Sequence, residues 1–148
     1  MGYAASNLRI RPAGSHHIDF LVRLRNELAD AFLSDEPATE DGTKAILHEM
    51  YVAEIEGEPV GAYSLYNRNR AEGSIEFGRF MVHPAYQGKG YGRKMLERAI
   101  VHARGMRFTS VVLDVKPDNV AAKRLYASEG FLFSTSADTP HQKMELTL

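Results

Sequence analysis

The 148-residue chain contains no cysteine and no tryptophan, and its formal net charge is only -1. The absence of cysteine excludes disulfides, thiolate metal ligands and a cysteinyl acyl-enzyme. The near-zero charge gives no electrostatic case for binding nucleic acid or a membrane surface. Neither an apolar run of about 18 residues nor a signal-peptide core is present. These absences favour a cytoplasmic protein, and the length favours a single domain spanning residues 1–148.

Hydrophobic periodicity predicts an alternating α/β chain with the element order βααββ followed by βαβαββ. Strands are expected at residues 8–11, 51–55, 60–66, 74–82, 109–115, 131–135 and 143–148. Helices are expected at 18–32, 43–49, 90–104 and 119–130. Strand–helix alternation in the second half implies a mixed sheet with helices on both faces.

Three finer expectations follow from these patterns. In strand 74–82, if no bulge occurs, Ile75, Phe77 and Met81 share one face, and the other face carries Glu76, Gly78, Phe80 and Val82. The helix at 43–49 is expected to turn Ala45, Ile46 and Met50 inward. The apolar run at 109–115 predicts a central strand buried on both faces.

The stretch HPAYQGKGYGRKML, residues 83–96, places three glycines around the start of the helix expected at 90–104. Unpaired N–H groups at a helix N-terminus bind anions, and glycine allows a phosphate to approach the backbone. Lys89 and Arg93 offer extra countercharge. The stretch does not match a Walker A loop, and Arg93 stands where a dinucleotide fingerprint requires its third glycine.

Two motifs together resemble the GNAT superfamily of acetyl-CoA-dependent acyltransferases. QGKGYG, residues 87–92, is similar to the [QR]-x-x-G-x-[GA] coenzyme loop of that family. The N-x-x-A-x-x-L-Y-x-x-x-G-F signature is matched by Asn119, Ala122, Leu125, Tyr126, Gly130 and Phe131. The resemblance implies a GNAT-type, mostly antiparallel central sheet and an acetyl-CoA co-substrate without a metal.

The resemblance also implies which residues bind the coenzyme. Backbone N–H groups would hold the pyrophosphate, the strand before the loop would pair with the pantetheine, and the Asn119 helix would contact the pantetheine and the 3′-phosphate. This set comprises Phe80, Met81, Val82, Gln87, Gly88, Lys89, Gly90, Tyr91, Gly92, Arg93, Asn119, Ala122, Lys123 and Tyr126. Tyr91 and Phe131 are also expected to pack in the core or beside the adenine.

Acetyl transfer to an amine needs a base on the acceptor side and an acid near the sulfur. Tyr126 is the candidate acid, with core packing as the alternative. Glu76 is the candidate base, acting directly or through water, and a solvent-facing strand glutamate is the alternative. His16 and His17 are adjacent, which is poor spacing for ligands on one helical face, so no metal is expected.

The acceptor is less constrained than the donor. Candidate specificity segments are residues 25–27, the acidic stretch 34–41 and residues 67–70. Arg68 and Arg70 would suit a nucleotide-linked amino sugar, whereas the acids Asp35, Glu36, Glu40 and Asp41 would attract a cationic amine. A small amine or amino sugar is favoured over a protein N-terminus.

Other functions and assemblies stay open. A non-catalytic acyl-CoA sensor and a nucleotide-phosphate-binding module are the alternative classes. The terminal strand at residues 143–146 is a candidate for pairing across a homodimer.

Overall fold

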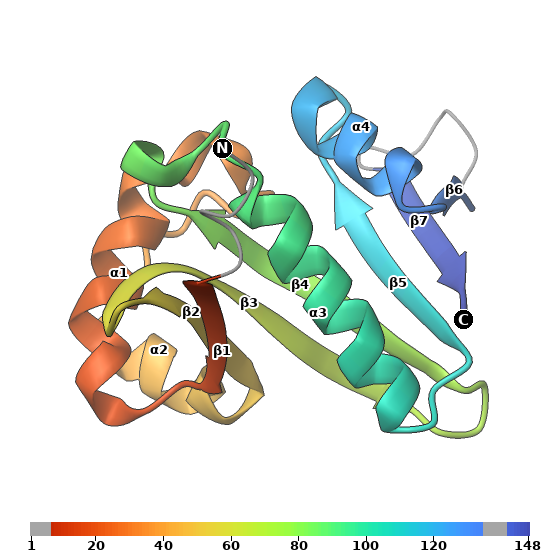
Figure 1. The fold of residues 1–148 in the computed structure, drawn as a ribbon, viewed down its shortest axis with the longest axis horizontal. Helices are drawn as coiled ribbons and strands as arrows, with labels where there is room; N and C mark the ends of the chain where they lie inside the picture. Colours follow the sequence, from red (N-terminus) through yellow and green to blue (C-terminus); the bar gives the residue numbers. More distant parts are fainter. Residues whose placement is uncertain (1–6, 135–141) are drawn as a thin grey trace.

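A computed structural model describes residues 7–134 and 142–148, and it shows the expected α/β fold (Figure 1). The strands are β1 (Leu8–Pro12), β2 (Met50–Ile55), β3 (Glu58–Asn69), β4 (Ser74–Val82), β5 (Ser110–Val115), β6 (Leu132–Phe133) and β7 (Gln142–Thr147). The helices are α1 (Ile18–Glu27), α2 (Glu40–Ile46), α3 (Tyr91–Gly105) and α4 (Val120–Ser128). The predicted element order is therefore confirmed.

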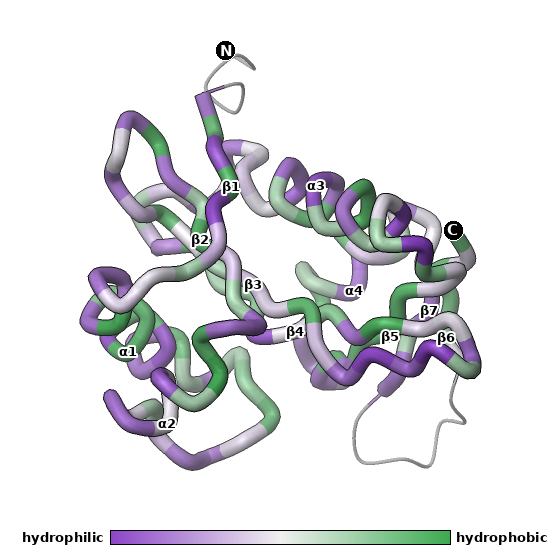
Figure 2. Tube along the Cα trace, turned by 90° about the horizontal axis from the view of Figure 1, so that it is seen from below, coloured by the Kyte–Doolittle hydropathy of each residue, from purple (hydrophilic) through white to green (hydrophobic). Residues whose placement is uncertain are grey.

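The strands form one sheet in the order β1-β2-β3-β4-β5-β7-β6, in which only the β4–β5 pair is parallel. Helices α3 and α4 lie on one side of the sheet, and α1 and α2 lie on the other (Figure 2). The larger core, under α3, includes Phe77, Leu96 and Met144, while a smaller core under α1 includes Leu21 and Met81. Within the described ranges, no helix is long and apolar enough to cross a membrane.

Strand β4 changes faces at Arg79, whose φ of 48° lies in the left-handed region. The β3–β4 register shifts nearby, which marks a β-bulge. Phe80 and Val82 consequently pack in the α3 core with Phe77, whereas Met81 joins the α1 core. The expected grouping of Met81 with Phe77, opposite Phe80 and Val82, is thus wrong, because one extra residue reverses the two-residue alternation.

Strands β4 and β5 separate after a short parallel contact. Their pairing runs from Ser74 opposite Ser110 to Glu76 opposite Val112 and goes no further, although β4 continues to Val82. This divergence opens the sheet near the glycine-rich turn. An edge of backbone N–H and C=O groups that lacks a strand partner favours pairing with another extended group.

Helix α2 begins three residues earlier than expected. Thr39 caps it, because its hydroxyl accepts a hydrogen bond from the N–H of Gly42 at 3.0 Å, and this favours a helix start despite the glycine. In this helix Thr43 is buried and Ala45 is exposed, contrary to the expectation that Ala45 points inward.

Two expectations about the C-terminal strands also need correction. Strand β5 alternates buried with half-buried positions and is not buried on both faces. Strand β7 lies between β5 and β6, so residues 143–146 do not form the edge strand that the dimer hypothesis used. Residue 135, the expected end of the preceding strand, lies outside the described residues.

Helix α3 should dominate the stability of the larger core. Leu96 is fully buried on this helix, whereas Val101 on the same helix is 62% exposed. Leu96→Ala should lower the free energy of unfolding by about 2–5 kcal/mol, because it removes buried methyl groups and leaves a cavity. Val101→Ala should change it by less than about 0.5 kcal/mol. Urea denaturation measures both, and equal effects would contradict this description of the core.

Candidate active site

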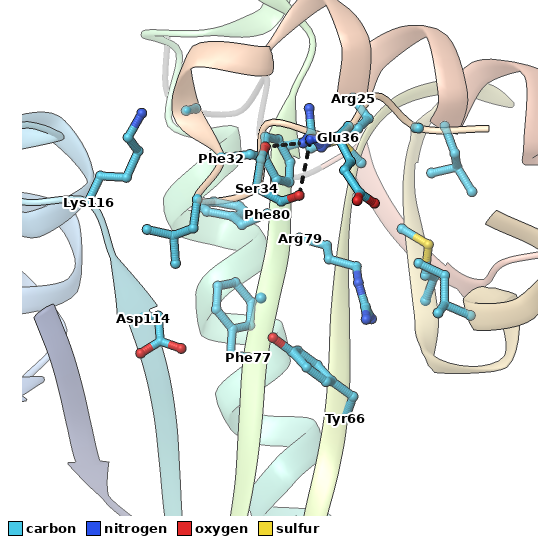
Figure 3. A pocket seen from close by; sticks show the side chains of 18 of the residues that line it. Arg25, Phe32, Ser34, Glu36, Tyr66, Phe77, Arg79, Phe80, Asp114 and Lys116 are labelled. Carbon is cyan, nitrogen blue, oxygen red and sulfur yellow. Dashed lines mark hydrogen bonds between the residues drawn. The ribbon is translucent and has the colours of Figure 1, made fainter. Parts of the chain in front are cut away.

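A pocket of about 640 Å³ lies where β4 and β5 diverge, and it is lined from both sides of the sheet. Six of the sequence-predicted site residues line it: Glu76, Phe80, Met81, Asn119, Ala122 and Tyr126. Figure 3 shows Asp114 on β5 across the pocket from Phe77 on β4. The structure therefore brings the candidate acid and the candidate base to one pocket, although they lie on different elements.

Tyr126 projects from α4 into an aromatic cluster. It is 6% exposed, and its ring centroid lies 5.8–6.5 Å from those of Phe77, Phe80 and Phe131. Burial raises the pKa of the Tyr126 phenol above its ordinary value. Within the described part of the chain, its hydroxyl has no hydrogen-bond partner. A protonated phenol on a pocket wall is chemically able to donate a proton to a bound group.

Glu76 sits on β4 and lines the pocket, at the last residue of β4 that pairs with β5. Its Oε2 accepts a hydrogen bond from the Tyr66 hydroxyl at 2.7 Å, and its Oε1 accepts one from the Asn67 amide at 3.0 Å. The carboxylate is therefore held in one orientation on the pocket wall. The sequence identified Glu76, but not the two neighbours that fix it.

The glycine-rich turn lies at the N-terminus of α3 and does not line this pocket. Gly88 and Gly90 have φ values of 73° and 89°, and Gly90 is the N-cap of the helix. Apart from the adjacent residues, no atom of the described residues comes within 4 Å of the position that a Cβ would take at either glycine. The turn thus presents open backbone and the positive end of a helix dipole, as an anion site requires.

Two predicted countercharges are engaged within the protein. Arg93 donates to Ser128 at 2.7 Å and forms an ion pair with Glu129 at 2.9 Å, which joins α3 to the end of α4. The Lys123 ammonium donates to the carbonyl of Pro117 at 2.6 Å. Lys89, by contrast, reaches only to within 5.9 Å of the Tyr86 ring.

Three of the motif residues serve the fold. Asn119 caps α4, because its side-chain oxygen accepts from the N–H of Ala122 at 3.2 Å. Tyr91 is buried at 5% exposure, as expected for a core residue, and Phe131 is buried at 1%.

The segment between α1 and α2 covers one end of the pocket. Arg25, which interrupts the apolar stripe of α1, donates to the carbonyls of Ser34 and Glu36 and stacks on Phe32 at 4.0 Å (Figure 3). Burial lowers the pKa of Arg25.

Two further contacts hold the same segment. Asn26 exchanges two hydrogen bonds with the backbone of Ala38. From the opposite wall, Lys116 donates to the carbonyl of Asp30 at 2.8 Å. These contacts hold the segment against the pocket, which Ser34, Glu36 and Ala38 line.

Sequence reasoning missed five polar residues of the pocket: Thr43, Tyr66, Arg79, Asp114 and Lys116. Arg79 pairs with Glu49 at 3.2 Å, and Asp114 pairs with Lys143 at 2.9 Å. The only local signals in the sequence were two charged residues inside strands, Arg79 in β4 and Asp114 in β5. Their convergence depends on sheet order and on the bulge, which local patterns do not reveal.

The predicted acceptor groups are only partly brought together. Of the four acids in the segment 34–41, only Glu36 lines the pocket. Arg70 instead donates to the carbonyl of Met106 and stacks on Phe108, and Arg68 does not line the pocket either.

His16, His17 and Glu54 form a cluster whose ligand atoms all lie within 4.8 Å of one another. Sequence spacing missed it, because Glu54 is 37 residues from His17. The two nitrogens of buried His17 face the N–H of Gly14 and the carboxylate of Glu54, while Arg11 pairs with Glu54 at 2.8 Å. Arg11 already supplies a cation to this carboxylate, which favours a structural network linking β1 and β2.

Comparisons with known proteins agree with this geometry. A spermine/spermidine N(1)-acetyltransferase of Bacillus subtilis is 33% identical over 85 residues, which are 57% of this chain and 56% of that relative. The chain thus matches about half the length of that curated relative. The N-alpha-acetyltransferase RimI of Mycobacterium tuberculosis is 35% identical over 108 residues, or 70% of this chain and 66% of the relative.

Similarity extends to solved structures. A putative acetyltransferase of Salmonella typhimurium, solved with its cofactor acetyl-CoA, superposes with a TM-score of 0.80 at 26% identity. That superposition covers 96% of this chain and 94% of the other. A model of the Acetyltransferase (GNAT) family matches residues 19–131. The matched region contains both the point where the sheet opens and the glycine-capped helix beside it. The chain therefore belongs to the GNAT family of acetyltransferases.

Proposed function

We propose that the protein is an N-acetyltransferase that moves an acetyl group from acetyl-CoA to the primary amine of a small molecule. The observation that carries the proposal is the pocket at the β4–β5 divergence, which holds a buried phenol and an oriented carboxylate close to an open helix N-terminus. The Salmonella typhimurium relative, solved with acetyl-CoA, supports the choice of donor.

In this proposal, acetyl-CoA binds along the opened edge of β4. Backbone N–H groups of residues 87–92 hold the pyrophosphate, and main-chain groups of Phe80, Met81 and Val82 pair with the pantetheine amides. Asn119 and Ala122 flank the pantetheine from α4. Lys89 is better placed than Arg93 to add countercharge, because Arg93 is paired with Glu129. Lys123 reaches the 3′-phosphate if its contact with Pro117 is exchanged.

The transfer is proposed as direct attack in a ternary complex. The amine nitrogen attacks the thioester carbonyl carbon, and a backbone N–H near Val82 stabilises the resulting oxyanion. Collapse of the tetrahedral intermediate breaks the C–S bond, and Tyr126 donates its proton to the departing thiolate. The proton lost by the amine passes to Glu76, directly or through one water.

A small acceptor fits the covered pocket better than a peptide does. The contacts made by Arg25, Asn26 and Lys116 hold the α1–α2 segment against the pocket as part of its lining. A nucleotide-linked amino sugar is less favoured, because Arg68 and Arg70 do not line the pocket. Glu36 and Glu76 favour a cationic amine, which is consistent with the polyamine acetyltransferase among the relatives.

A coenzyme-release assay across a panel of amines tests the reaction. The panel comprises polyamines, amino acids, glucosamine, a nucleotide-linked amino sugar and N-terminal peptides, each with acetyl-CoA. Small amines should release thiol and yield an N-acetylated product by mass spectrometry. Acetyl-CoA that raises the melting temperature without thiol release from any amine would instead identify a binding module.

Gly90→Ala should weaken acetyl-CoA binding by about 10-fold or more, because hydrogen bonds to charged groups are strong and a Cβ would block the pyrophosphate. Gly57→Ala is the matched control, since Gly57 has φ 83° and equally open space in the β2–β3 turn. Both variants should lose about 1–2 kcal/mol of stability to strain. Calorimetric titration separates the effects, and equal affinities in the two variants would exclude this loop from coenzyme binding.

Tyr126→Phe should lower kcat by about 10²- to 10⁴-fold while leaving acetyl-CoA affinity unchanged, because only the proton donor is removed. Tyr63→Phe removes a buried phenol outside the pocket and is the control. Because burial raises the pKa of Tyr126, the wild-type phenol stays protonated as pH rises, and kcat should not fall up to about pH 10. Full turnover by Tyr126→Phe would show that another group protonates the thiolate.

A further inference from the structure

The carboxylate of Glu76 is held at both of its oxygens by neighbours on β3. Tyr66 donates its hydroxyl to Oε2 at 2.7 Å, and Asn67 donates its side-chain amide to Oε1 at 3.0 Å. Each carboxylate oxygen can accept a second hydrogen bond. The arrangement therefore fixes the direction of the carboxylate while leaving acceptor capacity for an amine or a water.

The backbone of β3 is distorted at Asn67, one of the two residues that donate to Glu76. Side chains of consecutive strand residues ordinarily point to opposite faces, so Tyr66 and Asn67 should not both reach one cross-strand neighbour. Asn67 has a φ of 49°, and the register with β4 shifts between Tyr66 and Asn69. This irregularity turns the Asn67 amide toward Glu76, which lies directly opposite Tyr66 in the register. Bulges beside active sites commonly re-aim a side chain in this way.

The Tyr66 ring also depends on space supplied by β4. A Cβ on Gly78 would lie 2.8 Å from the Tyr66 hydroxyl, so only glycine leaves room for that hydroxyl at Glu76. The Arg79 guanidinium lies 4.4 Å from the centre of the same ring and is anchored by Glu49 at 3.2 Å. Asn67 and Arg79 are two of the four non-glycine residues with positive φ in the described chain; the first contacts Glu76 and the second contacts the Tyr66 ring.

We infer that Tyr66 and Asn67 are positioning residues that act through Glu76, orienting its carboxylate toward the acceptor amine. The inference rests on the proposed function, in which Glu76 receives the amine proton. Burial, and next the hydrogen bond to Glu76, raise the pKa of Tyr66, so its hydroxyl remains a donor at neutral pH. The hydrogen bond to Asp114 is the main cause that raises the pKa of Lys143. The negative charge of Glu76 adds a smaller effect in the same direction.

The test is a double-mutant cycle between Tyr66→Phe and Glu76→Gln, measured with the best amine from the panel. Tyr66→Phe removes one oxygen and keeps the ring under Arg79. It should lower kcat by about 10-fold or more, as expected for a lost hydrogen bond to a charged group, and leave KM for acetyl-CoA unchanged. In the Glu76→Gln background, it should cause no further loss. Tyr63→Phe, three residues earlier on β3, is the control and should retain wild-type kcat.

A second variant distinguishes the effect of the Asn67 side-chain amide from the effect of the positive φ at this position. Asn67→Gly removes the amide but accepts positive φ without strain, so it should lower kcat while the melting temperature changes little. It also keeps the inference testable if Tyr66→Phe folds poorly. Two outcomes would overturn the positioning role alone. In one, Tyr66→Phe lowers kcat by the same factor in the Glu76→Gln background as in the wild type. In the other, Tyr66→Phe and Asn67→Gly both keep wild-type kcat. Wild-type kcat in Glu76→Gln would instead overturn the base assignment in the proposed function, and the positioning role with it.

Discussion

The separation of β4 from β5 after Glu76 is the constraint on which the rest of the site depends. A continuous sheet would satisfy the backbone of β4 internally and would place the side chains of its two faces in separate layers. Because the sheet opens, Tyr126 from the α4 side and Glu76 from the opposite face reach one pocket. The opening also leaves strand edge beside the glycine cap of α3, where an extended ligand with an anionic end can pair and be held.

Two local distortions adapt the strands to this opening. The bulge at Arg79 moves Phe80 and Val82 into the α3 core, so that Phe80 packs near Tyr126. The irregularity at Asn67 directs a second donor to Glu76. Non-glycine residues at positive φ are strained, and strained backbone clusters at functional sites. Asn67 contacts Glu76 directly and Arg79 packs on the Tyr66 ring that contacts it, so both distortions agree with a site that orients this carboxylate.

Much of the fold could be predicted from the sequence, because its signals are local. Strand 74–82 and the helix after Gly90 were located by alternation, periodicity and a glycine cap, and the element order was confirmed. Three features were not predicted correctly: which faces the side chains of β4 take beyond Arg79, the exposure of Ala45, and the interior position of β7 in the sheet. A bulge, an N-cap formed by Thr39 and a strand order each depend on contacts that a local pattern does not contain.

The site residues also divide into those that a local sequence pattern predicts and those that depend on contacts between distant segments. Motif residues such as Asn119 and Tyr126 were found because their spacing resembles a family pattern, whereas Tyr66 and the Lys116–Asp30 contact join distant segments. The most direct test of the central claim is a crystal structure of the protein with CoA bound. We expect the pantetheine to lie between β4 and β5, with the thiol sulfur within hydrogen-bonding distance of the Tyr126 hydroxyl. Pantetheine bound outside the divergence, or a sulfur remote from Tyr126, would contradict it.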